Sequence, residues 1–149
     1  MKVADIGAGY GFFAFPAAAI VGDAGTVFAV EPNVKRAAEI SKKVAERGVK
    51  NLKVLEAGVE DIGEIAAGEV DIAMSISSFH HFADTKRGLL ELGRIVRPGG
   101  LVYIRDIKAG RIIRHGSRSE GFKRTVSEEF QNAEFEEGSG YLVARIRLE

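Results

Sequence analysis

A cluster of glycines near the start of the chain is the feature best suited to hold a ligand. Gly7, Gly9 and Gly11 follow a short apolar run and precede an alanine-rich segment that Gly22 closes. A strand that runs into such a cluster and then into a helix lets a ligand approach backbone N–H groups closely, because glycine has no Cβ atom. The sequence therefore predicts a ligand site at this turn.

The spacing of these glycines differs from the dinucleotide-binding fingerprint. That fingerprint has glycines at relative positions one, three and six, the last so that the helix can pack closely on the strand. Gly7 and Gly9 fit the first two positions, but Phe12 occupies the third. In addition, the Asp5 carboxylate would repel a pyrophosphate and would suit a cationic group. A nicotinamide dinucleotide is therefore the less favoured ligand.

Glu31 is a second carboxylate that the sequence places at a strand end. It follows the apolar run 26–30 and stands about twenty residues beyond the glycine cluster, where a nucleoside-binding fold carries its acidic residue. A carboxylate can accept hydrogen bonds from both ribose hydroxyls at once. We therefore predict that Glu31, with Pro32 after it, borders the ribose of a nucleoside cofactor.

Two adjacent histidines follow another apolar run. The run 70–76 contains Ser75 near its end, and His80 and His81 come shortly after it. Histidine changes its charge between pH 5 and 8, so at the edge of a pocket it can act as a general base. We predict this role for His80. The alternative interpretation is that the pair only holds the loop in place.

Three of these segments together resemble the class I S-adenosylmethionine-dependent methyltransferases. The pattern Asp-x-Gly-x-Gly-x-Gly at residues 5–11 is similar to the first motif of that family, whose cofactor carries a sulfonium and an ammonium group and no phosphate. The stretch from Ser75 through His80-His81-Phe82 to Arg97-Pro98-Gly99-Gly100 resembles the corresponding stretch of small-molecule methyltransferases. The resemblance covers residues 1–107, and Glu31 fits it as the ribose ligand.

The resemblance implies S-adenosylmethionine as cofactor and assigns residues to its site. Residues 56–61 are similar to the family's adenine site, but Gly58 stands where the family usually has an aspartate. Glu60 or Asp61 would have to replace that aspartate, with the N–H of Val59 serving a ring nitrogen. The residues that we expect to bind the cofactor are Asp5, Gly7, Ala8, Gly9, Tyr10, Gly11, Glu31, Pro32, Gly58, Val59, Glu60 and Ser75.

Alternating patterns predict the elements that position these residues. Short β-branched runs alternate with amphipathic segments, which is typical of a parallel sheet built from strand–helix units. We expect strands at 3–6, 26–30, 52–55, 70–76 and 101–107, helices at 12–21, 34–47 and 119–130, a helix that starts near 85 and stops at Pro98, a short helix or turn at 59–67, and a hairpin over 134–148.

The predicted fold is a single α/β domain over residues 1–149. It has a Rossmann-like, mostly parallel seven-stranded sheet with helices on both faces and, as the resemblance implies, an antiparallel last strand. The first expected strand begins almost at the first residue, so we expect the helices that the family usually carries before it to be lacking and apolar surface to be exposed near Tyr10, Phe12 and the His80 loop. A second copy of the chain or a partner chain is expected to cover this pocket rim.

The composition excludes several classes of function. The 149 residues carry 21 basic and 21 acidic side chains, so no global charge indicates a nucleic-acid or membrane partner. The absence of cysteine excludes disulfides, zinc–thiolate sites and iron–sulfur clusters, and with them radical use of S-adenosylmethionine. We expect no metal site. No apolar run has membrane-spanning length and the start lacks a signal-peptide pattern, so a cytoplasmic location is expected.

A cluster of basic side chains in the last third of the chain is followed by several glutamates. It is interpreted as a solvated helix and loop, with a site for an anionic substrate as the alternative. Its members are Arg105, Lys108, Arg111, Arg114, Arg118, Lys123 and Arg124.

These observations predict methyl transfer from S-adenosylmethionine to an unidentified small-molecule acceptor. His80 is the expected catalytic residue. Two alternatives remain open on the sequence alone. One is a nicotinamide-dependent oxidoreductase with Tyr103 or Tyr141 as proton donor, and the other is a non-catalytic subunit that binds S-adenosylmethionine.

Overall fold

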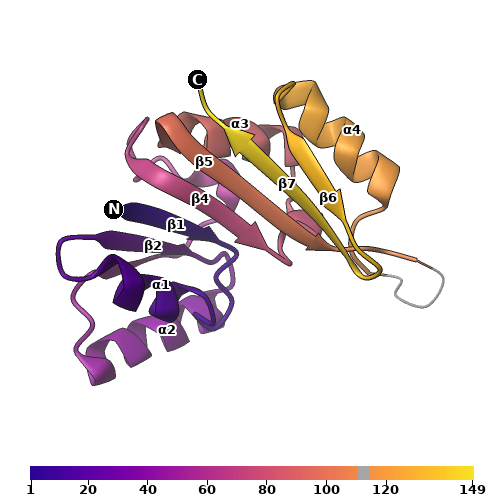
Figure 1. Ribbon diagram of the computed structural model, residues 1–149. Helices are drawn as coiled ribbons and strands as arrows, with labels where there is room; N and C mark the ends of the chain where they lie inside the picture. Colours follow the sequence, from indigo (N-terminus) through magenta and orange to yellow (C-terminus); the bar gives the residue numbers. More distant parts are fainter. Residues whose placement is uncertain (111–114) are drawn as a thin grey trace.

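The chain folds around one seven-stranded sheet. The computed structural model describes residues 1–110 and 115–149, so Arg111 and Arg114 of the basic cluster lie outside the described residues. The strands follow the order β3-β2-β1-β4-β5-β7-β6 (Figure 1). They are β1 (Lys2–Ile6), β2 (Thr26–Val30), β3 (Leu52–Leu55), β4 (Val70–Ile76), β5 (Val96–Ile107), β6 (Glu134–Glu137) and β7 (Tyr141–Arg147).

The direction of the strands confirms the predicted sheet. The pairs β1–β2, β1–β4, β2–β3 and β4–β5 are parallel. The last strand, β7, is antiparallel to β5 and to β6, with which it forms the expected hairpin. The sheet is therefore mostly parallel with an antiparallel last strand, as in a Rossmann-like fold.

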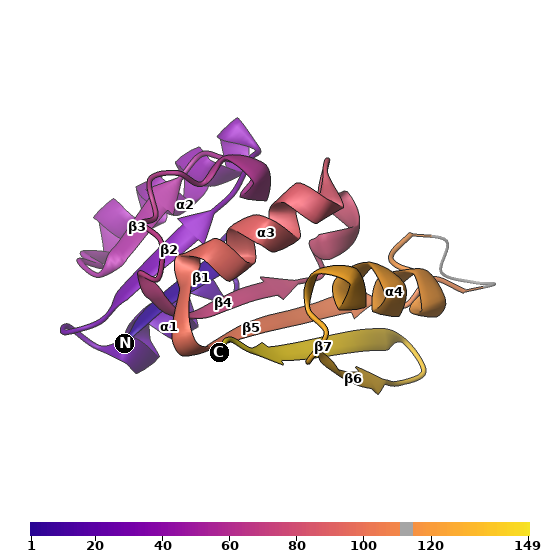
Figure 2. The ribbon, with the colours of Figure 1, turned by 90° about the horizontal axis from the view of Figure 1, so that it is seen from above.

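Helices cover both faces of the sheet. They are α1 (Ala14–Val21), α2 (Val34–Arg47), α3 (Thr85–Ile95) and α4 (Ser119–Glu129), with single 3₁₀ turns η1 (Val59–Asp61) and η2 (Phe79–His81). Because successive strand residues point to opposite faces, the sheet has two apolar layers. One layer packs β1–β4 against α1 and α2, and the other packs the sheet against α3 and α4 (Figures 1 and 2).

Local signals explain where the helices α2 and α3 begin and where α2 ends. The side chain of Asn33 accepts a hydrogen bond from the N–H of Arg36 at the start of α2, and Gly48 ends that helix in the left-handed conformation at φ 64°. The Asp84 side chain caps α3 in the same way. No helix in the described part of the chain has both the length and the apolar character that crossing a membrane requires.

Three element boundaries differ from the expectation. Helix α1 starts at Ala14 rather than at residue 12, because Phe12 and Phe13 still belong to the turn that follows the glycines. The segment 59–67 forms only the single turn η1. Strand β5 begins at Val96 and includes Pro98-Gly99-Gly100, because Val96 already pairs with Val70 of β4 across an irregular register.

The register brings three strand ends to one edge of the sheet. Ile6 of β1 pairs with Val30 of β2 on one side and with Ser75 of β4 on the other. The residues that follow these strands therefore meet above the gap between β1 and β4, where the strand order reverses. Ligands of open α/β sheets bind at such a switch point, outside the carboxyl ends of the strands.

Candidate active site

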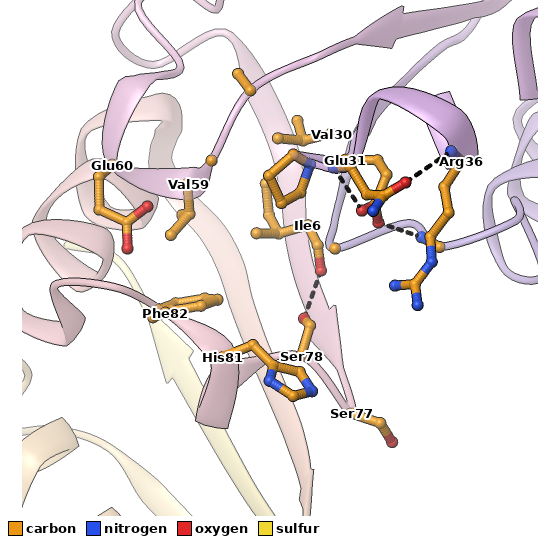
Figure 3. A pocket seen from close by; sticks show the side chains of 16 residues that line it. Ile6, Val30, Glu31, Arg36, Val59, Glu60, Ser77, Ser78, His81 and Phe82 are labelled. Carbon is orange, nitrogen blue, oxygen red and sulfur yellow. Dashed lines mark hydrogen bonds between the residues drawn. The ribbon is translucent and has the colours of Figure 1, made fainter. Parts of the chain in front are cut away.

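A cavity of about 440 Å³ lies at this edge of the sheet (Figure 3). Figure 3 shows Glu31 and Arg36 on one side of it, Val59, Glu60 and Phe82 on the opposite side, and Ser77, Ser78 and His81 at one end. Of the residues expected to bind the cofactor, those that line the cavity are Gly7, Gly9, Glu31, Pro32, Gly58, Val59 and Glu60. Those that lie outside its lining are Asp5, Ala8, Tyr10, Gly11 and Ser75.

The glycine loop uses its own N–H groups for internal hydrogen bonds. The N–H groups of Gly7 and Ala8 both donate to the carbonyl of Val30, at 2.8 and 2.9 Å, and that of Gly11 donates to Ala8 at 2.8 Å. The N–H of Gly9 donates to Oε2 of Glu31 at 2.8 Å. The expectation that this loop presents free N–H groups to a ligand is therefore wrong for these four.

At two glycines of the loop, the absence of a side chain makes room for different groups. A Cβ atom at Gly7 would lie 2.3 Å from Cβ of Ser78, so this glycine is needed for the loop to pack against the residues after β4. A Cβ atom at Gly9 would meet nothing within 4 Å, and Gly9 lines the cavity. The space over Gly9 is thus open to a ligand.

Glu31 is almost fully buried at the cavity wall. It is 3% exposed, and its two carboxylate oxygens accept hydrogen bonds from the N–H of Gly9 and from the N–H of Asn33, the latter at 2.9 Å. These bonds fix the carboxylate and tie the glycine loop to the end of β2. A carboxylate has about four acceptor positions, so each oxygen can accept one more hydrogen bond from a ligand.

Asp5 lies behind the glycine loop rather than in the cavity. It is 2% exposed, and within the described residues its Oδ2 atom is the one buried side-chain oxygen or nitrogen without a hydrogen-bond partner. Burial, together with the nearby charge of Glu31, raises the pKa of Asp5 from 3.8 to about 7, although a hydrogen bond with the backbone of Ala14 opposes this shift. Asp5 thus links the glycine loop to the start of α1.

The raised pKa of Asp5 predicts how stability depends on pH. Between about pH 4 and about pH 7 the folded protein holds a proton on Asp5 that the unfolded chain has released, so the free energy of unfolding falls as pH rises. The shift corresponds to roughly 4 kcal/mol. Denaturant titrations between pH 5 and pH 7.5 should show this decline in the unliganded protein.

Two variants separate Asp5 from other groups. Asp5→Asn should remove the decline, whereas Asp23→Asn on the exposed turn before β2 should keep it. Four other carboxylates have a lowered pKa, so they change the free energy of unfolding in the opposite direction and only below about pH 4.5. They are Glu69, Asp71, Glu136 and Glu137. A stability that stays level from pH 5 to pH 7.5 in the wild-type chain would contradict this account of Asp5.

The end of β3 supplies the wall opposite Glu31. Gly58 and Val59 line the cavity, and the carboxylate of Glu60 turns back over Gly58, where a Cβ atom would lie 2.8 Å from Oε2. Oε1 of Glu60 accepts a hydrogen bond from the N–H of Asp84 at 3.0 Å. The exposed Asp61 does not line the cavity. Of the two carboxylates considered for an adenine amine, Glu60 is therefore the one that lines the cavity.

Tyr10 lies on the surface next to the cavity. It is 60% exposed, and its ring is 5.6 Å from the guanidinium carbon of Arg36 and 5.7 Å from Nζ of Lys43. Arg36 itself lines the cavity. The cation–π contact therefore connects the glycine loop to the first turn of α2 beside Glu31.

The loop after β4 is held tightly against β1. Oγ of Ser78 donates to the carbonyl of Ile6 at 2.7 Å and lies 2.8 Å from Oγ of Ser75, which is fully buried. Ser77 adopts a positive φ of 57° and lines the cavity, and its N–H donates to the backbone carbonyl of Arg105 at 2.7 Å. A non-glycine residue in this conformation is strained, and such strain gathers at functional sites. Ser75 thus supports the loop from behind the cavity.

The two histidines point to different places. His81 lines the cofactor-sized cavity, whereas His80 lines a neighbouring cavity of about 260 Å³ between η2 and α4. The centroids of the two rings are 4.0 Å apart. Nδ1 of His80 lies 2.6 Å from Oδ1 of Asp106, a fully buried carboxylate near the end of β5. The two cavities are therefore adjacent, with η2 between them.

Sequence reasoning missed several residues of this site. Phe82, which the sequence offered only as part of the stretch His80-His81-Phe82, packs on the core and also lines the cavity. Arg36, Ser77 and Ser78 carried no motif of their own, although a serine-rich stretch directly after a predicted strand was a usable signal. Asp106 stands next to Arg105 near the end of the mostly apolar run 101–107, and that position was its only signal.

The geometry does not support the nicotinamide alternative. Phe12 is 79% exposed and the fully buried Ala14 packs against the sheet instead, so the size of Phe12 does not itself discriminate between cofactors. Four N–H groups of the loop are occupied within the protein, which leaves fewer of them for a pyrophosphate. Neither Tyr103 nor Tyr141 lines the cavity, and Tyr141 donates its hydroxyl to Glu136 at 2.9 Å.

Comparison with known proteins agrees with these features. A family described as "Methyltransferase domain" matches residues 4–104. An S-adenosylmethionine-dependent methyltransferase from Aquifex aeolicus is similar in structure, with a TM-score of 0.80, 23% identity, and coverage of 98% of this chain and 81% of that chain. A comparison with curated protein sequences gives no match.

Two further solved structures share the fold. An arsenic(III) S-adenosylmethionine methyltransferase from Chlamydomonas reinhardtii has a TM-score of 0.79 and 18% identity, over 99% of this chain and 63% of that chain. A Haloferax volcanii complex of a methyltransferase with the Trm112 methyltransferase activator has a TM-score of 0.78 and 16% identity, over 99% of this chain and 83% of that chain. At such identities the likeness shows the fold.

The sheet order, the cavity at the switch point and the carboxylate at the end of β2 define a nucleoside-cofactor enzyme of the Rossmann-like type. The family match extends over more than half of the chain, so the chain belongs to the methyltransferase domain family and uses S-adenosylmethionine as its cofactor. The chain is thus a methyltransferase rather than a nicotinamide-dependent oxidoreductase or a non-catalytic subunit, the two alternatives that the sequence left open.

Proposed function

We propose that this enzyme transfers the methyl group to a small-molecule acceptor that binds beside His80. The observation that carries the proposal is the adjacency of the two cavities, one lined by Gly9 and Glu31 and the other by His80. The second cavity measures about 260 Å³, which suits a small acceptor better than a macromolecule. It is lined by Phe79 and Phe122 together with polar side chains such as those of Ser117 and Thr125.

The residues that line the larger cavity fit S-adenosylmethionine. Glu31 retains acceptor positions for the ribose hydroxyls, and the open space over Gly9 accommodates a ligand. Glu60 and the backbone of Val59 stand at the opposite wall for the adenine, and Pro32 lies beside Glu31. The buried carboxylate of Glu31 places negative charge near the glycine loop, which favours a cation over a phosphate.

The protein contributes to such a reaction mainly by alignment. When bound, S-adenosylmethionine supplies a methyl group on a positively charged sulfur that a nucleophile can displace. Holding the acceptor in line in a dry pocket can contribute ~7–11 kcal/mol to the rate. The loop Ser77–Ser78 and the η2 turn stand between the two cavities, so we assign them the role of fixing the distance between cofactor and acceptor.

We propose His80 as the general base for the acceptor, which predicts a specific kinetic effect. His80→Gln should lower turnover while hardly changing the dissociation constant for S-adenosylmethionine, because His80 does not line the cofactor cavity. The loss should shrink as pH rises above the pKa of the acceptor itself. Formation of S-adenosylhomocysteine measured against pH checks this prediction.

A matched histidine variant serves as control. His115 is exposed and lies 6.3 Å from the His80 ring, so His115→Gln should keep wild-type turnover. Equal rates of His80→Gln and wild type at every pH would leave alignment as the only contribution of the protein and would refute the base.

We further propose that a second copy of this chain covers the outer face of α1. The segment 10–22 has no charged side chain, and it exposes Phe12 (79%), Ile20 (83%) and Phe13 (40%), with Pro16 also exposed between them. The expected exposure is thus present at Tyr10 and Phe12, whereas Phe79 of the His80 loop is buried. The formal net charge of zero means that two copies do not repel each other.

Light scattering at high protein concentration tests this proposal. The wild-type chain should have the mass of a dimer, and the double variant Phe12→Glu with Ile20→Glu should have that of a monomer. Leu90→Glu, at another exposed apolar position on α3, should leave the dimer intact. A monomeric wild-type chain would refute the second copy and direct attention to a partner chain such as an activator.

A cytoplasmic location remains a proposal from composition, which cell fractionation tests.

A further inference from the structure

Asp106 is an aspartate without an obvious reason to be buried in the sheet. It is 0% exposed near the end of β5, in the layer that also holds Ile104 and Leu142. A buried carboxylate is costly unless it is paired and hydrogen-bonded. In the described part of the chain its one ion-pair partner is His80, and no lysine or arginine lies within ion-pair distance of it.

Both oxygens of Asp106 are occupied in a defined way. Oδ1 lies 2.6 Å from Nδ1 of His80, and Oδ2 accepts a hydrogen bond from Oγ of Ser117 at 2.6 Å. The three residues come from β5, from η2 and from the segment before α4. His80 is 26 residues from Asp106 in the chain and Ser117 is 11 residues from it, and the fold brings the three side chains together.

The contact fixes which nitrogen of His80 carries the proton. An ionised carboxylate can only accept hydrogen bonds, so Nδ1 must be the donor. In the neutral ring the lone pair is then on Nε2, the nitrogen on the other side of the ring. Nε2 makes no hydrogen bond to the described residues, and His80 lines the smaller cavity with its side chain 10% exposed.

The base is thus oriented toward the space where an acceptor would bind. Phe79 and Phe122 form apolar walls of that cavity beside it. On the other side, the ring of His81 lies 4.0 Å away and belongs to the cofactor cavity. The titratable and charged groups around the His80 ring are Asp106 from β5, its neighbour His81, and His115 and Arg118 from the segment before α4.

We infer that the methyl acceptor is a hydroxyl compound and that Asp106 is a positioning residue that makes His80 its base. As the acceptor oxygen bonds to the methyl carbon, the carbon–sulfur bond breaks, its electron pair stays on sulfur, and the hydroxyl proton moves to Nε2 of His80. The ring is then an imidazolium that Asp106 stabilises. The inference rests on the proposed function, because it names the acceptor class of the same site.

The chemistry of the possible acceptor atoms favours oxygen. A neutral amine attacks with its lone pair and needs no base before transfer. A thiol, with an ordinary pKa of about 8.5, ionises appreciably without help near neutral pH. A phenol ionises only near pH 10 and an alcohol at still higher pH, so a hydroxyl gains most from a fixed base, in the order of 10²–10⁴-fold in rate. A buried, doubly hydrogen-bonded aspartate that orients a histidine is therefore most useful for O-methylation.

The protonation of the histidine ring can be read without any acceptor. Long-range ¹H–¹⁵N correlation spectra of the wild-type protein should show His80 protonated on Nδ1 and free on Nε2 at a pH where the ring is neutral. Asp106→Asn should perturb this tautomer, whereas Ser117→Ala should keep it. A wild-type His80 protonated on Nε2 would overturn the positioning role of Asp106.

The acceptor class is tested with matched probes. Phenols and aliphatic alcohols are offered with methyl-labelled S-adenosylmethionine, beside anilines, amines and thiols of the same carbon skeletons, and products are identified by mass spectrometry. O-methyl products should predominate. Asp106→Asn should lower their kcat at least about tenfold with little change in KM, and the loss should shrink above the pKa of a phenol probe.

The outcomes separate this inference from the proposed function. Preferential N- or S-methylation, no product from any hydroxyl probe, or full kcat in Asp106→Asn would overturn the inference. Calorimetry with S-adenosylmethionine alone reports whether the cofactor site is correct. If the wild type and Asp106→Asn bind the cofactor equally and the hydroxyl probes stay unreacted, the cofactor site stands and the acceptor class is wrong.

Discussion

Gly9→Val is expected to abolish binding of S-adenosylmethionine. A Cβ atom at Gly9 meets no protein atom within 4 Å, and the residue lines the cavity, so the valine side chain would fill space that the cofactor needs. Isothermal calorimetry should show no heat of binding at cofactor concentrations that saturate the wild-type protein.

The control for this variant must share its backbone strain. Gly9 has a φ of 58°, and a valine there is strained whatever space it has. Gly48 at the end of α2 has a φ of 64°, also with nothing within 4 Å of a Cβ atom, and it lies outside the cavity. Gly48→Val should lose similar stability but bind the cofactor normally. Normal binding by Gly9→Val would place the cofactor elsewhere.

Glu31→Ala should weaken cofactor binding at least tenfold with the fold intact. The variant removes the charged acceptor that we assign to the ribose hydroxyls, and hydrogen bonds to charged groups contribute roughly 1.5–3 kcal/mol each. It also frees the N–H of Gly9, which now donates to Oε2, so the glycine loop loses its tie to β2.

An exposed glutamate provides the comparison. Glu64 lies on the surface outside the cavity, so Glu64→Ala should have the dissociation constant of the wild type. Thermal unfolding should confirm that both variants are folded. An unchanged dissociation constant in Glu31→Ala would show that this carboxylate only braces the loop.

Most of the fold was predictable because its signals are local. The helix α2 follows from its apolar positions Ala37 and Ile40, its cap Asn33 and its final Gly48, all readable in sequence. The start of β5 was not predictable, because Val96 joins the sheet only through its pairing with Val70 in a different segment. The glycine turn was placed correctly, but the start of α1 was not.

Residues of the candidate site could be predicted where they come directly after a strand in the chain. Gly9 and Glu31 were found because they follow the first two strands of an expected parallel sheet. Asp5 was expected in the cavity, but its position inside β1 places it behind the loop, where it is buried. Asp106 was missed, because it meets His80 only across the ends of β5 and η2, 26 residues apart in the chain.

Calorimetric titration of the wild-type chain with S-adenosylmethionine and, separately, with NAD tests the central claim most directly. The account predicts micromolar binding of S-adenosylmethionine and of S-adenosylhomocysteine, and no binding of NAD, because four N–H groups of the glycine loop are already bonded to Val30, Ala8 and Glu31. Tight binding of NAD, with no heat from either S-adenosyl compound, would contradict it.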